Sequence, residues 1–529
     1  MSDIDKFEKK LLNILNSASN AKAWSDLLPM SKEILSLLIK NEKDIDFSKL
    51  STKYILAKRL AQCLNPEFPN GVHDVILDIY KTLLLNIQKK QDTAIQDNLS
   101  LYLSGLFPFF SHASLPNKKK FLDNIIKNII LNIKTDELIL CFPGVLAALI
   151  PGLDDNDEKT TKLIFQAFED FINKLNYQDQ PQIFFGSLWT ILLRNQHLRN
   201  GGMKYLSQKV ITYEELMKNP KEKQQELIEF YYPNVNTTII NALGEITQDK
   251  EIATARYGMD FIMTRFPLIK ENTIITDEAK INLITKVLNL LVAEEPSINR
   301  RLNNWICGLT SMQEDEPDYN SENMEYIMNL VTKSFEKIFV PEYNYDFEEL
   351  KNKLNILKGF FKNNPKFSDF VLPKISLIIL QCVVKYWQVE LNGSENVKDN
   401  EIILKVTDFF SQNNYNELLW ISLAEKLKSI IEKKDQENNE QNHINIDILK
   451  NFDEFSEKKI LEKLDENINQ LKFCLIFIDI STNEGRIMNY LPIIMHLLNI
   501  CKKIEINNRE NLKNLRTIIL ICLIIIQNF

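Results

Sequence analysis

The sequence predicts an all-α fold, built as an α-solenoid of HEAT/armadillo-like helical hairpins. Glycine and proline are scarce, with 13 and 17 in 529 residues, which disfavours sandwiches, barrels and dinucleotide-binding folds with their many tight turns. Apolar residues recur at helical spacing along the chain, and no convincing stretch alternates strictly between apolar and polar residues. Pro66, Pro108 and Pro151 lie 42 and 43 residues apart, close to the roughly 40–47 residues of one HEAT or armadillo repeat.

The first predicted helix begins within the first ten residues. Its apolar residues on one face are Ile4, Phe7, Leu11, Ile14 and Leu15. We expect this face to dock as the first helix of the solenoid and to cover its core. A second interpretation places the same face on a membrane surface. Charged residues from position 3 onward interrupt the sequence too early for a signal peptide.

Two further helices are clearly marked by their patterns. One apolar stripe consists of Ile164, Phe168, Phe171, Ile172 and Leu175. Thr276 is the expected cap of a later helix, with Asp277 and Glu278 in its first turn, where the helix dipole favours acids. The stripe of that helix is wide and comprises Ile281, Leu283, Ile284, Val287, Leu288, Leu290 and Leu291. A stripe of this width predicts packing against two neighbouring helices.

The longest apolar run, residues 138–153, is shorter than the roughly 20 residues that a membrane span needs, and it contains two Pro-Gly pairs. Residues 517–526 are also apolar but form a shorter run. We expect both runs to be buried helices. For the second run, a span that continues beyond residue 529 stays an alternative.

Composition predicts three regions along the chain. Residues 1–310 are dense in apolar residues and form the first predicted domain, and residues 311–323 form an acidic linker. Residues 324–529 are predicted to form a further helical, solenoid-like segment. A polar insertion near residues 432–442 (EKKDQENNEQN) interrupts this last segment.

No reaction chemistry is indicated by the residues. None of the five histidines stands beside a nucleophile motif, and no metal-ligand spacing, phosphate loop or dinucleotide fingerprint occurs, so we predict no catalytic, metal or cofactor site. We expect His73 to cap or hydrogen-bond a helix start. The acids at 154–158 lack the glycine and spacing of a calcium loop, and a solvated loop before a helix is expected there.

The charge and the cysteines limit the class of protein. A net charge of −8 disfavours binding to nucleic acid, because nucleic-acid binders usually carry a basic face. The seven cysteines are widely spaced, contain no CxxC pair and mostly sit among apolar residues. We interpret them as reduced core cysteines of a cytosolic protein.

Lys118, Lys119 and Lys120 form the sharpest basic cluster, and they follow an aromatic segment at 107–110. One hypothesis is a lipid contact, with the lysines on anionic headgroups. About 1 kcal/mol for each lysine makes this a weak anchor by itself. The alternative is an ordinary solvated turn.

Six ordered segments resemble the N-terminal domain of the Dopey family. They are residues 54–66 (YILAKRLAQCLNP) with 69–73 (PNGVH), 105–108 (GLFP) with 113–114, 149–153 (LIPGL), 184–189 (FFGSLW), 199–206 (RNGGMKYL) and 297–308 (SINRRLNNWICG). The resemblance spans roughly residues 53–309. Members of that family are several times longer than this chain.

The last of these segments contains Asn299, Arg300, Arg301 and Trp305 at a predicted helix start. A structural interpretation buries Trp305 between helices and ties the arginines to neighbouring helix ends or acids. The other interpretation is a partner-binding ridge, because arginine and tryptophan are typical interface anchors.

The resemblance implies a non-enzymatic scaffold of traffic between endosomes and the Golgi. It implies an Arf-exchange-factor-related armadillo scaffold and an aminophospholipid flippase as partners, and a cytoplasmic, peripheral location on Golgi or endosome membranes. Three alternatives remain: a module that binds phosphoinositides or anionic membranes directly, an enzyme with a novel site, and a solenoid adaptor of another transport route.

Overall fold

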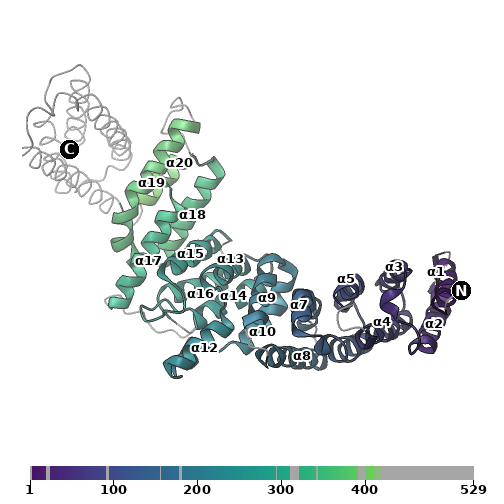
Figure 1. Cartoon of the computed structure of the whole chain (residues 1–529). Coiled ribbons are helices and arrows are strands. Elements are labelled where there is room, and N and C mark those ends of the chain that lie inside the picture. The colour runs from purple at the N-terminus through teal and green to yellow at the C-terminus, as the bar shows by residue number, and fades with distance from the viewer. Residues whose placement is uncertain are drawn as a thin grey trace, which may run out of the picture. The chain divides into compact units, whose positions relative to one another are not determined.

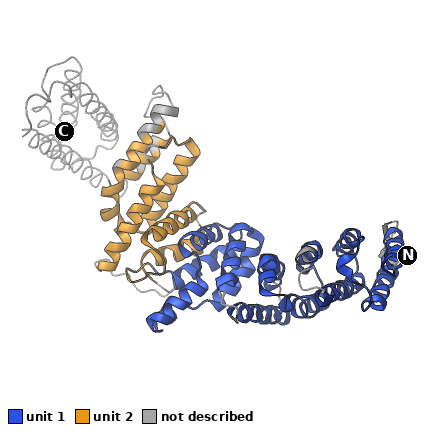
Figure 2. Cartoon of the chain, in the orientation of Figure 1, with its two compact units in different colours: residues 1–267 blue, residues 268–529 orange. Residues whose placement is uncertain are grey.

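The computed structural model of the chain is all-α over the residues it describes, which confirms the all-α part of the prediction. It describes residues 3–411 and 415, except for 20–23, 91–94, 155–156, 178–181, 294, 310–320, 341–342, 391–400 and 412–414, and no strand occurs among the residues described. The chain divides into two compact units, residues 1–267 and 268–529 (Figure 2). The predicted linker at 311–323 falls mostly outside the described residues, and the predicted insertion near 432–442 falls wholly outside them.

The α-helices described in the first unit are α1 (Asp3–Ser19), α2 (Trp24–Asn41), α3 (Lys53–Cys63), α4 (Asn70–Lys90), α5 (Ile95–Leu106), α6 (Leu115–Phe121), α7 (Thr135–Leu149), α8 (Glu158–Tyr177), α9 (Gln182–Arg194), α10 (Arg199–Lys209), α11 (Tyr213–Met217), α12 (Lys221–Tyr231), α13 (Ile240–Thr247) and α14 (Ile252–Arg265). Short 3-10 or π turns join several of them: η1 (Phe47–Lys49), η2 (Phe107–Ser111), η3 (Leu122–Lys127), η4 (Ile130–Asn132), η5 (Ile150–Leu153), η6 (Gln196–Leu198) and η7 (Val235–Ile239).

Helices of the first unit pack in two rows (Figure 1). One row is α1, α3, α5, α7, α9 and α13, and the other begins with α2, α4, α6 and α8, so that each helix contacts the next member of its own row. The rows join through α1 and α2, α3 and α4, and α7 and α8. Consecutive helices therefore form pairs, and successive pairs stack side by side.

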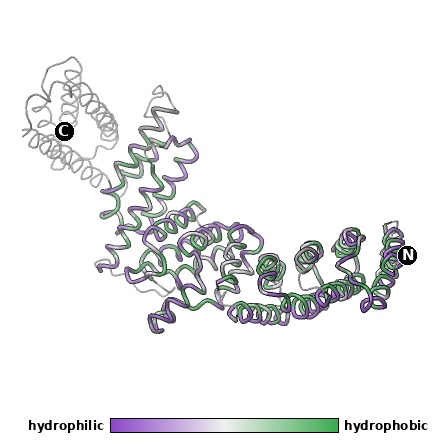
Figure 3. Tube along the Cα trace, viewed as in Figure 1, coloured by the Kyte–Doolittle hydropathy of each residue, from purple (hydrophilic) through white to green (hydrophobic). Residues whose placement is uncertain are grey.

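The core of the first unit lies between these rows. Both hydrophobic and hydrophilic residues occur along most helices (Figure 3), and most of the large apolar side chains described in this unit are buried. The predicted stripe from Ile164 to Leu175 on α8 is fully buried, as are Phe7, Leu11 and Leu15 of α1. Phe7 stacks on Phe47 with the ring centroids 5.7 Å apart. The first helix thus docks on its neighbours, as expected from its pattern.

Long-range hydrogen bonds in the first unit recur at the spacing of one helical pair. His112 donates to the Leu64 carbonyl, 48 residues away, and the Trp189 indole donates to the Tyr231 carbonyl, 42 residues away. Asn86 binds the Glu42 carbonyl at a separation of 44 residues. These separations resemble the 42 and 43 residues between the three prolines.

The apolar run at 138–153 forms most of α7 and all of η5. The segment Thr135–Leu153 is the one stretch among the described residues with the length and composition of a membrane span, and 56% of it is buried in the unit. It packs against η2 and α9 in the first row. Core helices have the same length and composition, and the packing of α7 agrees with the predicted buried helix. The run at 517–526 lies outside the described residues.

The second unit repeats the alternate packing over α15 (Asp277–Val287), η8 (Leu288–Ala293), α16 (Pro296–Ile306), α17 (Glu322–Ile338), α18 (Phe347–Asn363), η9 (Pro365–Phe367), α19 (Ser368–Glu390) and α20 (Glu401–Ser411). Here α15 contacts α17 and α17 contacts α19, while α18 contacts η8 and α20. Thr276 caps α15 by accepting a hydrogen bond from the Ala279 N–H, as predicted. The α-helix ends at Val287, and the rest of the predicted stripe continues as a tighter 3-10 turn, a common ending for a helix.

Candidate docking surface

The segments singled out in the sequence meet at the junctions between helices. The first junction holds the end of α3. His73 donates from Nε2 to the Asn65 carbonyl and His112 from Nε2 to the Leu64 carbonyl, both at 2.9 Å. The Phe109 ring packs against both imidazoles, 5.0 Å from the His73 ring and 5.4 Å from that of His112, and the two imidazoles are 6.5 Å apart. His73 therefore secures the end of the preceding helix, and not a helix start as expected.

Burial lowers the pKa of His73. The hydrogen bond to the Asn65 carbonyl acts in the opposite direction, and the nearby His112 lowers this pKa further. The ring is almost fully buried, and Nδ1 has no hydrogen-bond partner among the described residues. A neutral imidazole that donates through Nε2 fits this environment. The geometry indicates a structural role for His73, which holds the end of α3 in place. No nucleophilic side chain of the described residues hydrogen-bonds to it.

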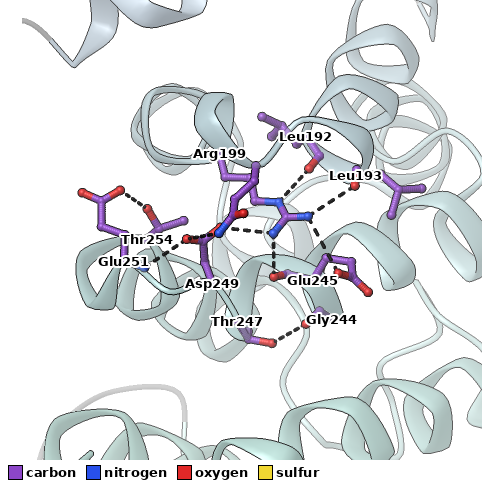
Figure 4. A network of polar contacts seen from close by, with 10 residues as sticks. Leu192, Leu193, Arg199, Gly244, Glu245, Thr247, Asp249, Glu251 and Thr254 are labelled. Atoms are coloured by element: carbon purple, nitrogen blue, oxygen red, sulfur yellow. Dashed lines mark hydrogen bonds and ion pairs between the residues drawn. The ribbon is translucent and has the colours of Figure 1, made fainter.

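Arg199 organises a second junction, between α9, α10 and α13 (Figure 4). Its guanidinium donates to the carbonyls of Leu192 and Glu245 and to the Asp249 carboxylate, at 3.0, 3.1 and 3.1 Å. The side chains of Arg199 and Asp249 are 9% and 5% exposed. The arginine satisfies the ends of two helices at once, because the last carbonyls of a helix have no partner within it.

Gly201 and Gly202 lie in the same segment, residues 199–206, and neighbouring atoms come too close to both for a larger residue to fit without a shift. A Cβ on Gly201 would lie 2.6 Å from the Ile150 carbonyl oxygen, and one on Gly202 would lie 2.4 Å from Leu192 Cδ2. Lys204 pairs with Asp154 at 3.1 Å across the same contact. These residues of the 199–206 segment hold α10 against η5 and α9, so most of that segment serves packing.

The acids before α8 also have structural partners. Asp157 accepts hydrogen bonds from the Thr160 N–H and hydroxyl at 3.0 and 2.6 Å and thereby caps the start of α8. Asp154 is half-buried and pairs with Lys204 at 3.1 Å, so it is only partly solvated. No group of three His, Cys, Asp or Glu residues within the described part of the chain could hold a metal ion.

Four of the seven cysteines fall within the described part of the chain, and no disulfide joins them. Cys382 is buried, whereas Cys63, Cys141 and Cys307 are half-buried at the edge of the core. Burial raises the pKa of both Cys63 and Cys141 to about 11, so these thiols stay protonated at neutral pH. Such thiols are poor nucleophiles.

The predicted ridge of Asn299, Arg300, Arg301 and Trp305 lies on α16. Trp305 is completely buried, and it is among the largest buried side chains described. Arg301 is half-buried and donates to the Ser297 carbonyl at 3.0 Å, whereas Arg300 is exposed. Asn299 Oδ1 is buried without a hydrogen bond among the described residues. A partner on this helix would therefore meet Arg300 first and would reach Trp305 only after repacking.

The structure separates the three lysines of the predicted lipid contact. Lys118 is 4% exposed, with its ammonium 5.6 Å from the Phe110 ring centroid. Lys120 pairs with Asp74 at 2.7 Å and with Asp78 at 2.8 Å. Burial disfavours the charge of Lys120, but these two aspartates outweigh it and raise its pKa. Lys119 alone of the three is exposed, so the cluster does not present three charges to one surface.

A groove of about 520 Å³ lies beside the first junction. Leu27, Met30 and Ile34 of α2 line it together with Leu60 of α3, Phe68 and Phe109. Arg59, Gln62 and His112 add polar groups to the lining. Two of the family-like segments, 54–66 and 105–108, thus contribute residues to one groove.

The outer face of α3 leads to this groove. Tyr54 is 66% exposed and Ile55 is 43% exposed, and both are large apolar side chains. Lys58 is exposed and Arg59 half-buried, and these follow Tyr54 and Ile55 at the four-residue spacing that places side chains on one helical face. We did not single out this face from the sequence. The sequence feature that could have identified this face is the presence of three cations and no acid in the eleven residues of α3.

Comparisons with known proteins place the chain next to one family. The family model described as "Dopey, N-terminal" matches residues 1–311. The chain is 21% identical over 474 residues to Protein DOP1 of Saccharomyces cerevisiae and 21% identical over 477 residues to Protein DOP1B of Xenopus laevis, alignments that cover 80% and 83% of this chain. It is 25% identical over 329 residues, or 61% of its length, to the Protein DOP1 homolog of Drosophila melanogaster.

These relatives are much longer proteins. The chain spans 27% of the yeast protein, 20% of the frog protein and 11% of the fly protein. An engineered protein of known crystal structure aligns over 78% of this chain at 13% identity, with a TM-score of 0.28 that carries no structural argument.

Proposed function

The chain belongs to the Dopey family, and from this membership we propose that it is a non-enzymatic scaffold of vesicle-mediated protein transport between endosomes and the Golgi. The match of the Dopey N-terminal model to residues 1–311 is the observation that carries the proposal. Its mechanism is the display of partner-binding surfaces on stacked helices, without the making or breaking of a covalent bond.

The fold supports a docking function. From α1 to α9, and again between α15, α17 and α19 and between α18 and α20, helices pack on the next but one, and we propose that this is the pattern of an α-solenoid with HEAT/armadillo-like hairpins. Such a fold leaves one side of every helical pair exposed. The junctions at Arg199 and His73 keep neighbouring pairs in register, so partner-binding side chains on different helices hold fixed positions.

The proposed partners follow from the family. They are an Arf-exchange-factor-related armadillo scaffold and an aminophospholipid flippase, on the cytoplasmic face of Golgi or endosome membranes. We propose a peripheral attachment, in which contacts with membrane proteins supply most of the binding.

Fractionation and imaging of the tagged full chain in cells test this function. We expect it to overlap with Golgi or endosome markers, to sediment with membranes and to be released by an alkaline carbonate wash. A diffuse distribution, or one at the nuclear envelope, would contradict the proposal and would favour the adaptor of another transport route.

Liposome flotation separates the scaffold from a direct lipid-binding module. We expect the full chain to remain unbound to vesicles of phosphatidylcholine with phosphatidylserine or phosphoinositide, because Lys118 and Lys120 are already held within the protein. Flotation that is lost when Lys118, Lys119 and Lys120 are all changed to Glu would support the lipid-binding alternative.

A further inference from the structure

We propose that the outer face of α3 and the adjoining groove bind an acidic amphipathic peptide segment of a partner protein. The proposal rests on the docking function above and names the class of partner that one surface takes. The surface consists of Tyr54, Ile55, Lys58, Arg59 and the groove lined by Leu60 and Met30.

Charge is the first argument for an acidic partner. Lys53, Lys58 and Arg59 place three positive charges on α3, although the chain as a whole has a net charge of −8. Lys53 binds the Ser48 carbonyl and the Asn98 side chain, and Arg59 binds Gln62 at 2.8 Å. Within the described part of the chain, no carboxylate pairs with any of the three cations.

Three other lysines of the same unit are neutralised within the protein. Lys120, Lys204 and Lys209 each form an ion pair with a carboxylate of a neighbouring element. Lys58 and Arg59 of α3 instead keep their charge available to a carboxylate from outside. A partner with Asp or Glu at these positions gains the attraction without displacing an internal pair.

Apolar exposure is the second argument. Tyr54 and Ile55 leave large apolar surface in water, one helical turn before Lys58 and Arg59. Arg59 also lines the groove, whose other walls are largely apolar. Arginine and tyrosine beside an apolar pocket are the residues that most often dominate the energy of an interface. An amphipathic helix would place its apolar side chains in the groove and its acids over Lys58 and Arg59.

The shape of the site favours a peptide over a membrane. The site is a groove lined by residues of α2, α3 and η2, with Arg59, Gln62 and Pro66 among its walls. A groove of this kind admits side chains of a narrow partner, whereas a bilayer presents a broad surface. Membrane binding is therefore the alternative outcome of the test.

A displayed library of 16-residue peptides, selected against the full chain at low salt, tests the proposal. We expect the enriched peptides to be acidic, to contain large apolar residues at helical spacing, and to bind at least tenfold more weakly when salt is raised to 0.5 M. Enrichment of neutral or basic peptides, or the absence of any enrichment, would overturn the proposal.

Matched variants locate the binding surface. Lys58→Glu with Arg59→Glu should weaken binding of the selected peptides about tenfold or more. Lys119→Glu with Lys127→Glu makes the same change in net charge at two other exposed lysines and should leave binding within about twofold. Circular dichroism confirms folding, and Tyr54→Ala gives a second test without any change in charge. Equal loss in both charge variants would mean non-specific attraction and would contradict the assigned site.

Two further readouts distinguish the sources of failure. Binding of the wild-type chain to phosphatidylserine vesicles that is lost with Lys58→Glu and Arg59→Glu would assign α3 to a membrane and overturn the peptide proposal. If the charge-reversed chain fails to bind peptides yet keeps its Golgi or endosome location, both proposals hold and other surfaces recruit the chain. If the wild-type chain binds acidic peptides but never reaches these membranes, the traffic function fails and the peptide site stands.

Discussion

At the scale of single residues, buried cations in this protein stabilise helix ends. Arg199 binds carbonyls of α9 and α13 and the buried Asp249 carboxylate. Arg265 binds the Ser207 and Val210 carbonyls, both at 2.8 Å. Such residues look like interface anchors in a sequence. Most of their hydrogen-bond partners, however, lie inside the protein and more than 40 residues away; the exceptions are the end of α9 for Arg199 and Thr264 for Arg265.

Arg199→Met should lower the free energy of unfolding by about 3–5 kcal/mol, because it leaves the buried Asp249 carboxylate without its partner. Chemical denaturation of the first unit within the full chain measures this change. Adding Asp249→Leu should recover part of the loss. Two losses that simply add would show that the residues do not act as a pair.

His73 should give the stability a local dependence on pH. Its pKa is lowered in the folded state by burial, so the unfolded state takes up a proton first as the pH falls. The stabilisation by neutral His73 is therefore complete above its usual pKa of 6.5 and declines below it. The difference in free energy of unfolding between wild type and His73→Gln should narrow between pH 7.5 and 5.5. A difference that is constant over this range would refute the assignment.

Trp305 and Arg300 should respond very differently to substitution. Trp305→Ala should lower the free energy of unfolding by about 3–5 kcal/mol, because the indole is fully buried. Arg300→Ala should change it by roughly 0.5 kcal/mol or less, because this side chain is exposed. Thermal denaturation compares the two variants. A stable Trp305→Ala chain with weakened partner binding would identify the tryptophan as an interface anchor.

At the scale of elements, helix packing depends on small residues at contact points. Gly105 of α5 faces Ala61 of α3, and a Cβ there would lie 2.5 Å from the Ala61 Cβ. Neither atom belongs to a flexible side chain, so one helix would have to move. Gly105, like Gly201 and Gly202, therefore allows neighbouring elements to approach closely.

Gly105→Ala should destabilise the first unit by about 1–3 kcal/mol through overpacking of α3 against α5. Gly71→Ala is the matched control, because Gly71 lies in α4 with nothing within 4 Å of its added Cβ. This control should stabilise by about 0.4–1 kcal/mol through the unfolded state. Urea denaturation of both variants should show opposite signs, and equal signs would contradict the described packing.

The sequence predicted helices and their buried faces well because both are local properties. The stripe from Ile164 to Leu175 and the Thr276 cap needed only helical spacing and a capping residue. The roles of polar residues were harder to predict, because they depend on partners in distant helices. Lys120 was predicted to belong to a cluster of surface charges. The two aspartates with which it pairs lie 42 and 46 residues earlier in the sequence, so local patterns do not reveal them. The α3 face was not predicted, because only the folded structure shows that no carboxylate of the other described elements pairs with its cations.

At the scale of the whole molecule, the chain combines two units of alternately packed helices with membership of a family of much longer proteins. Its share of those proteins is at most about a quarter for the relatives compared above. A scaffold in this family is expected to act through contacts, and its exposed surfaces are where such contacts form. The face of α3 is the first surface that the structure offers for that purpose.

Proximity labelling with the full chain in intact cells tests the central claim most directly. We expect the labelled proteins to be enriched in peripheral and integral proteins of Golgi and endosome membranes, including an Arf-exchange-factor-related scaffold and a flippase. The charge-reversed α3 variant should lose a subset with acidic amphipathic segments and keep the rest. A labelled set dominated by nuclear-transport or mitochondrial proteins would contradict the claim.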